Sequence, residues 1–239
     1  MITSPSNPRL RLVRRLASRR QRERTGLFVC EGEDLVEAAL AAGVEPVELL
    51  VDGHRPVDLP SAEAVDPGLL AEVSTLGHPP RVVGVFRRDD LPRLDPRKPP
   101  PVGLALWHVA DPGNIGTLLR AADGLGPAFV ALSDRCADPT GPKALRASAG
   151  AVFRVPTVSF DDAPGRHVAL VADGGIPLQQ LHFDGATTFV LGAERDGLPD
   201  EIVAACDESV TIPLQDEADS LNVAMAGSIA LYERRRRVT

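Results

Sequence analysis

The sequence predicts an α/β protein with two domains. Short apolar runs alternate along the chain with segments of helical periodicity, a pattern typical of parallel or mixed sheets covered by helices. With 239 residues and 44% hydrophobic content, the chain can bury the cores of one large or two small domains. Five prolines between residues 91 and 101 indicate a semi-rigid linker. We therefore predict domains at residues 1–90 and 102–239, joined by residues 91–101.

The first predicted domain is a small α/β sandwich. Helical periodicity or helix-ending residues predict three helices, at residues 4–24, 33–42 and 67–72. Short β-type runs predict strands at residues 27–30, 47–51 and 82–86. Because strands and helices alternate, we expect a parallel or mixed sheet in this domain.

The second predicted domain has a mostly parallel sheet covered on both faces. Its strands are separated by helical segments, as parallel connections require. Strands are expected at residues 102–109, 129–132, 168–172, 187–192 and 210–212. Helices are expected at residues 117–125, 143–150, 199–205 and 223–231, with Asn114 and Ser220 as candidate N-caps.

The charge distribution indicates a phosphate-rich partner although the net charge is −7. Residues 1–30 carry eight arginines and one acid, and a second basic run covers residues 234–237. Clusters of this kind are typical of surfaces that bind nucleic-acid backbones. A solvated helix face is the alternative interpretation. The arginines that we predict to bind RNA are Arg9, Arg14, Arg15, Arg19 and Arg20.

Cysteine content and hydropathy exclude several other classes. Three widely spaced cysteines form neither a disulfide framework nor a metal-binding spacing, so we predict no metal site. No apolar segment follows the basic N-terminus as in a signal peptide, and none approaches the length of a membrane span. These features favour a cytoplasmic protein without a membrane partner.

Polar residues follow three strands of the second predicted domain. The first loop and its helix carry Asn114 and Arg120, the second loop carries Glu194, and the third carries Ser220 and Asn222. Loops at the carboxyl ends of parallel strands commonly bind ligands, although ordinary helix caps would look similar. Arg120 lies in an apolar helix, where a guanidinium is either paired or directed at a ligand. Three histidines, His108, His167 and His182, show no partner signal and are expected to be structural.

Taken in order, these segments resemble the three motifs of the SpoU (TrmH-like) branch of the SPOUT RNA ribose 2′-O-methyltransferases. The matching segments are residues 111–122 (DPGNIGTLLRAA), 190–198 (VLGAERDGL) and 212–226 (IPLQDEADSLNVAMA). Residues 143–156 also fit the family pattern. Residues 6–9 and 28–32 resemble the L30e-like RNA-binding extension of many members.

The resemblance implies a C-terminal SPOUT methyltransferase domain, an α/β trefoil knot, behind a small L30e-like α/β domain. It further implies S-adenosylmethionine as cofactor, a homodimer with sites at the subunit interface, and an RNA substrate. Residues carried over as cofactor contacts are Gly192, Ala193, Ile212, Leu221 and Ala172. Residues carried over as catalytic are Arg120, Asn114, Glu194, Ser220 and Asn222. Arg195 and Asp196 depart from the smaller or neutral residues of relatives, which leaves the contacts of this loop open.

The reaction that the resemblance implies is methyl transfer to a ribose 2′-hydroxyl. We expect the substrate to be 23S ribosomal RNA, because tRNA-directed relatives often lack the N-terminal domain. Arg120 would stabilise alkoxide character at that hydroxyl. Since arginine stays protonated, the proton acceptor is either Glu194 or an RNA phosphate. Three alternatives stay open: a tRNA methyltransferase, a resistance methyltransferase acting on large-subunit rRNA, and a non-catalytic RNA-binding module on the same fold.

Overall fold

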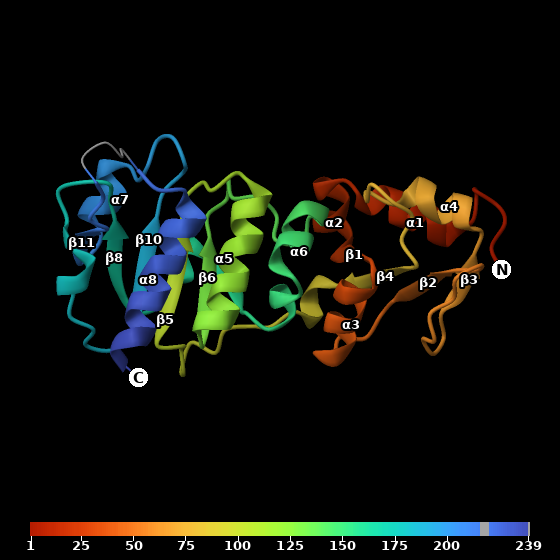
Figure 1. Ribbon diagram of the computed structural model, residues 1–239, viewed down its shortest axis with the longest axis horizontal. Coiled ribbons are helices and arrows are strands. Elements are labelled where there is room, and N and C mark those ends of the chain that lie inside the picture. Colours follow the sequence, from red (N-terminus) through yellow and green to blue (C-terminus); the bar gives the residue numbers. More distant parts are fainter. Residues whose placement is uncertain (216–219, 239) are drawn as a thin grey trace.

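The computed structural model describes residues 1–215 and 220–238. Figure 1 shows an elongated molecule with two sheets placed end to end along its long axis, and the N-terminus at one end. The first sheet comes from residues 27–87 and the second from residues 102–211. Residues 91–101 connect the two without forming a helix or strand. The exact domain boundaries stay a prediction.

The N-terminal sheet is mixed. Its four strands have the order β1-β4-β2-β3, with β4 antiparallel to β1 and β2, and β2 parallel to β3. The strands are β1 (Leu27–Glu31), β2 (Glu48–Asp52), β3 (Glu63–Val65) and β4 (Val82–Arg87). The helices are α1 (Pro8–Leu16), α2 (Arg19–Thr25), α3 (Glu33–Ala41) and α4 (Pro67–Val73).

The single helix predicted over residues 4–24 is wrong. The chain forms α1 and α2 instead, because Ser18 between them has an extended backbone. The Arg22 guanidinium explains how the chain turns here. Its Nη1 donates to the carbonyl oxygens of Leu16 and Ala17, both at 2.9 Å, and so satisfies groups that the end of α1 leaves open. Arg22 is therefore a buried structural residue of the basic segment.

The C-terminal sheet is parallel at every pairing, as predicted. Its seven strands have the order β7-β6-β5-β10-β8-β11-β9. The strands are β5 (Val102–Leu106), β6 (Ala128–Leu132), β7 (Thr157–Ser159), β8 (Arg166–Leu170), β9 (Ile176–Pro177), β10 (Thr187–Leu191) and β11 (Glu208–Thr211). The helices are α5 (Pro112–Leu125), α6 (Pro142–Ser148), α7 (Asp200–Ala204) and α8 (Val223–Val238). Four 3₁₀ turns complete the described chain: η1 (Arg88–Asp90), η2 (Ala151–Phe153), η3 (Phe160–Asp162) and η4 (Leu178–Gln180).

Both faces of this sheet are covered. Neighbouring residues of β5 point to opposite sides, as strand geometry requires, so Leu104 joins one core and Ala105 another. On the first side α5 and α8 lie across the sheet, as Figure 1 shows. On the second side, Ala105 packs in a cluster with Phe160 of η3 and Ile202 of α7. The sheet is thus held from both sides, and its strand ends are fixed in position.

The two sheets meet at a buried junction next to α6, which Figure 1 shows at the boundary between them. Phe28, Phe86 and Phe153 pack together there, with ring centroids 6.1–6.2 Å apart. Beside them lies a set of polar residues that we call the junction cluster: Arg22, Arg88, Asp138 and Thr140. The Asp138 side chain is 4% exposed, accepts from Arg22 Nε at 2.8 Å and from Thr140 Oγ1 at 2.7 Å, and is paired with Arg88. The junction therefore joins the two parts through both apolar and ionic contacts.

Within residues 1–215 and 220–238, no helix is both long enough and apolar enough to cross a membrane.

Candidate active site

Three loops that follow strands of the C-terminal sheet meet at one edge. They come after β5, β10 and β11, and the loop after β8 lies between them. Because all these strands are parallel, their carboxyl ends lie at the same edge of the sheet. The sequence predicted its site residues at these loops, and the structure brings most of them together.

Three predicted site residues form a continuous chain of hydrogen bonds, which we call the polar chain. Asn114 Nδ2 donates to Glu194 Oε1 at 2.6 Å, and Asn222 Nδ2 donates to Asn114 Oδ1 at 3.2 Å. The members are 80 and 108 residues apart in sequence, so folding alone makes them neighbours. All three are at least partly exposed, which leaves the second carboxylate oxygen of Glu194 open to a substrate.

The helix caps differ from those predicted. Asn222, not Ser220, caps α8: its Oδ1 accepts from the backbone N–H groups of Ala224 at 2.9 Å and Met225 at 3.3 Å. Asp111, not Asn114, caps α5, since its Oδ1 accepts from the Asn114 N–H at 3.0 Å. The first difference arises because α5 begins at Pro112, five residues earlier than predicted. The second arises because α8 begins at Val223, as predicted, so the residue directly before it is Asn222. The capping frees the Asn114 side chain for the polar chain.

Lys143 steadies the start of α5. Its Nζ lies 2.7 Å from Asp111 Oδ2, and this hydrogen bond, against the opposing effect of partial burial, keeps the pKa of Asp111 below its usual value. Asp111 stays ionised as a helix cap, which favours its interaction with the helix N-terminus. Neither Asp111 nor Lys143 was predicted from the sequence as a site residue. The aspartate immediately before Pro112 was the signal that could have identified the cap.

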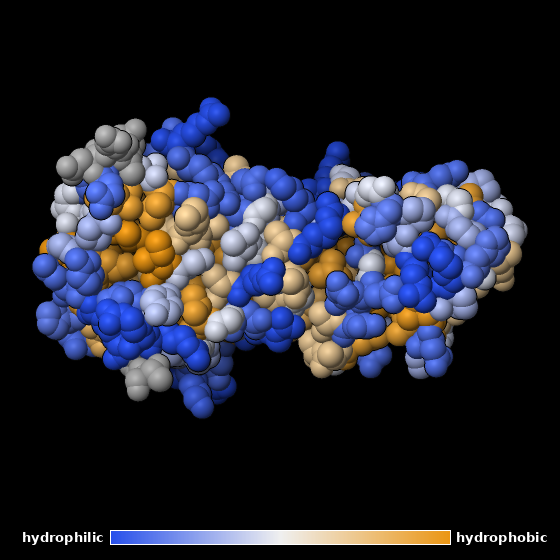
Figure 2. Space-filling model, in the orientation of Figure 1, coloured by the Kyte–Doolittle hydropathy of each residue, from blue (hydrophilic) through white to orange (hydrophobic). Residues whose placement is uncertain are grey.

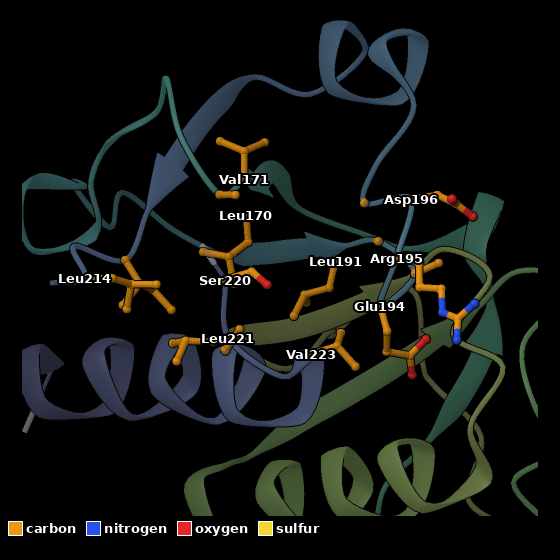
Figure 3. Close-up of a pocket in the computed structure, with 16 residues that line it drawn as sticks. Leu170, Val171, Leu191, Glu194, Arg195, Asp196, Leu214, Ser220, Leu221 and Val223 are labelled. Atoms are coloured by element: carbon orange, nitrogen blue, oxygen red, sulfur yellow. The ribbon is translucent and has the colours of Figure 1, made fainter. Parts of the chain in front are cut away.

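A cavity of about 340 Å³ lies beside the polar chain. Figure 3 shows that its walls come from the loops after β8, β10 and β11 and from the start of α8. The predicted cofactor residues Ala172, Gly192, Ala193, Ile212 and Leu221 all line it, together with Glu194 and Ser220. The lining also includes apolar side chains that were not predicted: Leu170, Val171, Leu191, Leu214, Val223 and Ala226.

Gly192 allows the loop after β10 to close on itself. Ala193 pairs with Gly197, whose N–H donates to the Ala193 carbonyl at 3.0 Å, and Gly197 has a φ of +64°. A Cβ on Gly192 would collide with the backbone of Gly197 and Leu198. The tight loop presents Glu194, Arg195 and Asp196 at the rim, and Figure 3 shows the Arg195 and Asp196 side chains directed away from the cavity interior.

Arg120 does not join the polar chain within one subunit. It lies on the exposed side of α5, outside the cavity lining, and makes no hydrogen bond or ion pair with any residue that the structure describes. The neighbouring helix α8 exposes three large side chains at helical spacing: Met225 (57% exposed), Ile229 (37%) and Tyr232 (56%). Figure 2 shows apolar surface at this end of the molecule, over α8 and adjoining segments.

The five predicted RNA-binding arginines fall into two groups. Arg9 pairs with Glu48 at 2.9 Å, Arg14 with Glu72 at 3.2 Å, and Arg19 with Glu23 at 2.7 Å. Arg15 and Arg20 are exposed and have no such partner among the described residues. Only the second group therefore presents free positive charge in this state of the protein.

In the described part of the chain, no group of three or more His, Cys, Asp or Glu side chains is placed to hold a metal ion.

The chain is similar to several rRNA methyltransferases. The 23S rRNA (guanosine(2553)-2′-O)-methyltransferase RlmP of Bacillus subtilis is 29% identical, covering 98% of each chain. The 23S rRNA (uridine(2479)-2′-O)-methyltransferase of Streptomyces viridochromogenes is 31% identical over 91% of this chain and 85% of its own. An S-adenosylmethionine-bound rRNA methyltransferase from Sinorhizobium meliloti superposes with a TM-score of 0.87 at 28% identity, covering 100% of this chain and 98% of that one.

Two family profiles also match. The MRM3-like substrate binding domain matches residues 7–81, and the SpoU rRNA methylase family matches residues 101–232. The predicted fold class, an α/β SPOUT methyltransferase domain behind a small α/β domain, is confirmed by these matches and by the parallel sheet. With more than half of its residues matched by that profile, the chain belongs to the SpoU rRNA methylase family.

Proposed function

We propose that this protein transfers a methyl group from S-adenosylmethionine to a ribose 2′-hydroxyl of 23S ribosomal RNA. The observation that carries the proposal is the polar chain at the rim of an apolar cavity, built from three loops that are far apart in sequence. The 23S assignment is supported by two relatives named as 23S rRNA 2′-O-methyltransferases, which this chain matches over nearly its whole length. An RNA substrate of this kind implies a cytoplasmic protein.

The cavity fits the cofactor by its chemistry. Its apolar walls, Leu170, Leu191, Ile212 and Leu221 among them, suit an adenosine ring system, and the volume of about 340 Å³ lies in the usual range for small-molecule sites. Gly192 and Ala193 expose backbone groups on the inner side of the closed loop. The cofactor would supply an electrophilic methyl group on a sulfonium at this place.

The polar chain suits the acceptor side of the reaction. In this transfer the ribose O2′ would form a bond to the methyl carbon, and the carbon–sulfur bond would break with its electron pair left on sulfur. The hydroxyl proton must leave, and the open oxygen of Glu194 is placed to accept it. Asn114 fixes the other carboxylate oxygen, and Asn222 fixes Asn114, so the carboxylate is held in one orientation before substrate arrives.

Arg120 enters this mechanism as part of a homodimer. It is exposed and unpartnered among described residues and lies off the cavity of its own chain. Its helix α5 packs against α8, which exposes the apolar stripe Met225, Ile229 and Tyr232 on its surface. A two-fold axis at this surface would cover the stripe and carry Arg120 to the partner's site. There its guanidinium would stabilise negative charge at O2′ and contact the adjacent phosphate.

The test is methyl transfer from labelled S-adenosylmethionine to purified 23S rRNA, 16S rRNA and tRNA. We expect label in 23S rRNA with the wild type and almost none with Glu194→Ala, while calorimetry shows cofactor binding in both. Because Glu194 Oε2 faces the substrate side, Glu194→Gln should also be inactive although it keeps the hydrogen bond to Asn114. Label only in tRNA would show that the substrate is tRNA and not 23S rRNA. Cofactor and RNA binding without label in any RNA would support a non-catalytic module.

A further inference from the structure

A stacked pair of aromatic side chains directly follows β5, in the segment that leads to α5, and has no part in the mechanism above. The rings of Trp107 and His108 have centroids 4.3 Å apart and planes inclined by 24°. Phe160 supports Trp107 from a second side with an edge contact at 5.2 Å. Trp107 is the only tryptophan in the chain. The chain is poor in aromatic residues, at 4%, so a stack at this position calls for an explanation.

The strand order places this pair opposite the cofactor cavity. Trp107 directly follows β5, and its N–H donates to the carbonyl of Leu191, the last residue of β10, at 2.8 Å. The cavity lies over the ends of β10, β8 and β11, whereas Trp107 and His108 lie on the side of β5 and β6. Glu194 lines the cavity, and its hydrogen-bond partner Asn114 lies in α5, the helix that follows Trp107 and His108 in the chain. A ribose held at Glu194 would therefore have the methyl donor on one side and the stacked rings on the other.

His108 is held in an unfavourable backbone conformation. Its φ is +55°, a region that costs non-glycine residues about 1 kcal/mol. Its N–H donates to Ser133 Oγ at 2.9 Å, and its Nε2 lies 3.4 Å from Asp134 Oδ1. Two contacts from the loop after β6 thus fix both the backbone and the ring. The ring is 25% exposed, so part of it faces solvent. His108 had been expected to be structural, because its partner Asp134 is distant in sequence.

The surroundings suit a nucleotide. A flat ring that is partly exposed and backed by a second ring is a surface on which proteins stack unpaired RNA bases. Arg135 is exposed next to Asp134 and makes no hydrogen bond or ion pair with a described residue, so it can contact a phosphate. Asp134 is 82% exposed and would repel phosphate at its own position, which directs the backbone of the RNA towards Arg135.

We propose that Trp107 and His108 form the platform on which the base of the methylated nucleotide stacks. The proposal rests on the proposed function, because it presupposes an RNA ribose at Glu194. Stacking would hold the nucleotide out of its RNA helix and so help to select which ribose reaches the site. His108 is then a specificity-determining residue that touches the substrate.

The single tryptophan makes the proposal directly measurable. We expect a 23S rRNA fragment that carries the methylated nucleotide to quench Trp107 fluorescence on binding. Heparin, which offers charge without bases, should bind the basic surface without the same quenching. Equal spectra with and without the RNA fragment, at concentrations where it is bound, would overturn the proposal.

Three variants separate stacking from structural effects. His108→Gly removes the ring and relieves the backbone, so we expect the KM for RNA to rise about tenfold, in line with the loss of one stacked base, with an unchanged melting temperature or a higher one. His108→Phe keeps a ring and should recover most of that loss. His182→Ala removes an exposed ring beyond the opposite ends of the strands and should change neither KM nor quenching.

The outcomes distinguish this inference from the proposed function. If the wild type methylates RNA but His108→Gly has wild-type KM and quenching, the platform is wrong and the function stands. If His108→Gly weakens cofactor binding equally, His108 has a structural role instead. If the wild type methylates no RNA, the proposed function fails first.

Discussion

The junction cluster and the polar chain both consist of polar side chains brought together from distant segments. They differ in solvent exposure and in how many of their carboxylate oxygens have a hydrogen-bond partner. At the junction, Asp138 is 4% exposed and accepts hydrogen bonds from three side chains. In the polar chain, Glu194 is exposed and one of its oxygens has no partner among the described residues. A buried and fully paired charge contributes to structure, whereas an exposed and half-paired one is available to a substrate.

The largest effect should come from breaking the junction cluster. Asp138→Ala leaves the Arg22 guanidinium buried without its counter-ion, and we expect the free energy of unfolding to fall by about 3–5 kcal/mol. Urea denaturation followed by circular dichroism measures this. Glu72→Ala breaks an exposed pair with Arg14 and should cost less than about 1 kcal/mol. If Asp138→Ala does not fold, Asp138→Asn keeps the shape and gives a smaller loss to measure. If the Asp138 and Glu72 variants lost equal free energies of unfolding, the buried pair would be no more stabilising than the exposed one.

A second prediction sharpens the comparison at the active site. Arg120→Ala and Glu194→Ala should each lower turnover about a hundredfold without altering the urea midpoint, because neither side chain is buried. Heterodimers of the two variants, purified through two different tags, should regain about half of the wild-type turnover, since one of their two sites has both residues intact. Heterodimers as inactive as the parents would place Arg120 and Glu194 in the same subunit's site.

Acid should remove the stability that the ionised Asp138 gives to the junction. Burial alone would raise the pKa of Asp138, but the hydrogen bond from Thr140 and the charge of Arg88 outweigh burial, so this pKa lies below 3.8. A lowered folded-state pKa adds stability above the unfolded value, and this stability is lost as pH falls through the folded one. The stability difference between wild type and Asp138→Asn should be full at pH 7 and shrink below about pH 4. A constant difference from pH 7 to pH 3 would contradict this.

The smallest effect concerns the basic segment. Arg15 and Arg20 are free in the described structure, so replacing either by alanine should weaken RNA binding a few-fold and reduce the salt slope of affinity by about one. Arg9→Ala is the matched control, because Arg9 already pairs with Glu48. Filter binding at several salt concentrations tests both. An equal loss for Arg9 would show that RNA displaces its carboxylate partner.

The sequence predicted the elements whose pattern is local. Strands β5 and β10 read as apolar runs, and their loops carry the polar residues that meet at the site. Strands β3, β7 and β9 were missed, because two or three residues are too few to show a period. The break between α1 and α2 was missed because it depends on where the Arg22 guanidinium lies after folding.

The site was also predictable only where its signal is a local sequence pattern. The motifs identified Asn114, Glu194 and Asn222, but no local pattern shows that they share hydrogen bonds across 80 and 108 residues. The apolar wall residues Leu170 and Val223 were missed because each also reads as ordinary core. The contact of His108 with Asp134 could not be predicted, because Asp134 comes from the loop after the neighbouring strand. Which loops are neighbours depends on the order of the strands in the sheet, and no local sequence pattern indicates that order.

Asn222 has a consequence for biosynthesis. The same side chain caps α8 and completes the polar chain, and residues 220–226 also close the cavity. Synthesis runs from the N-terminal side, so a growing chain contains the N-terminal strands, Asn114 and Glu194 before Asn222 is added. Until then it has neither a closed cofactor site nor an oriented carboxylate.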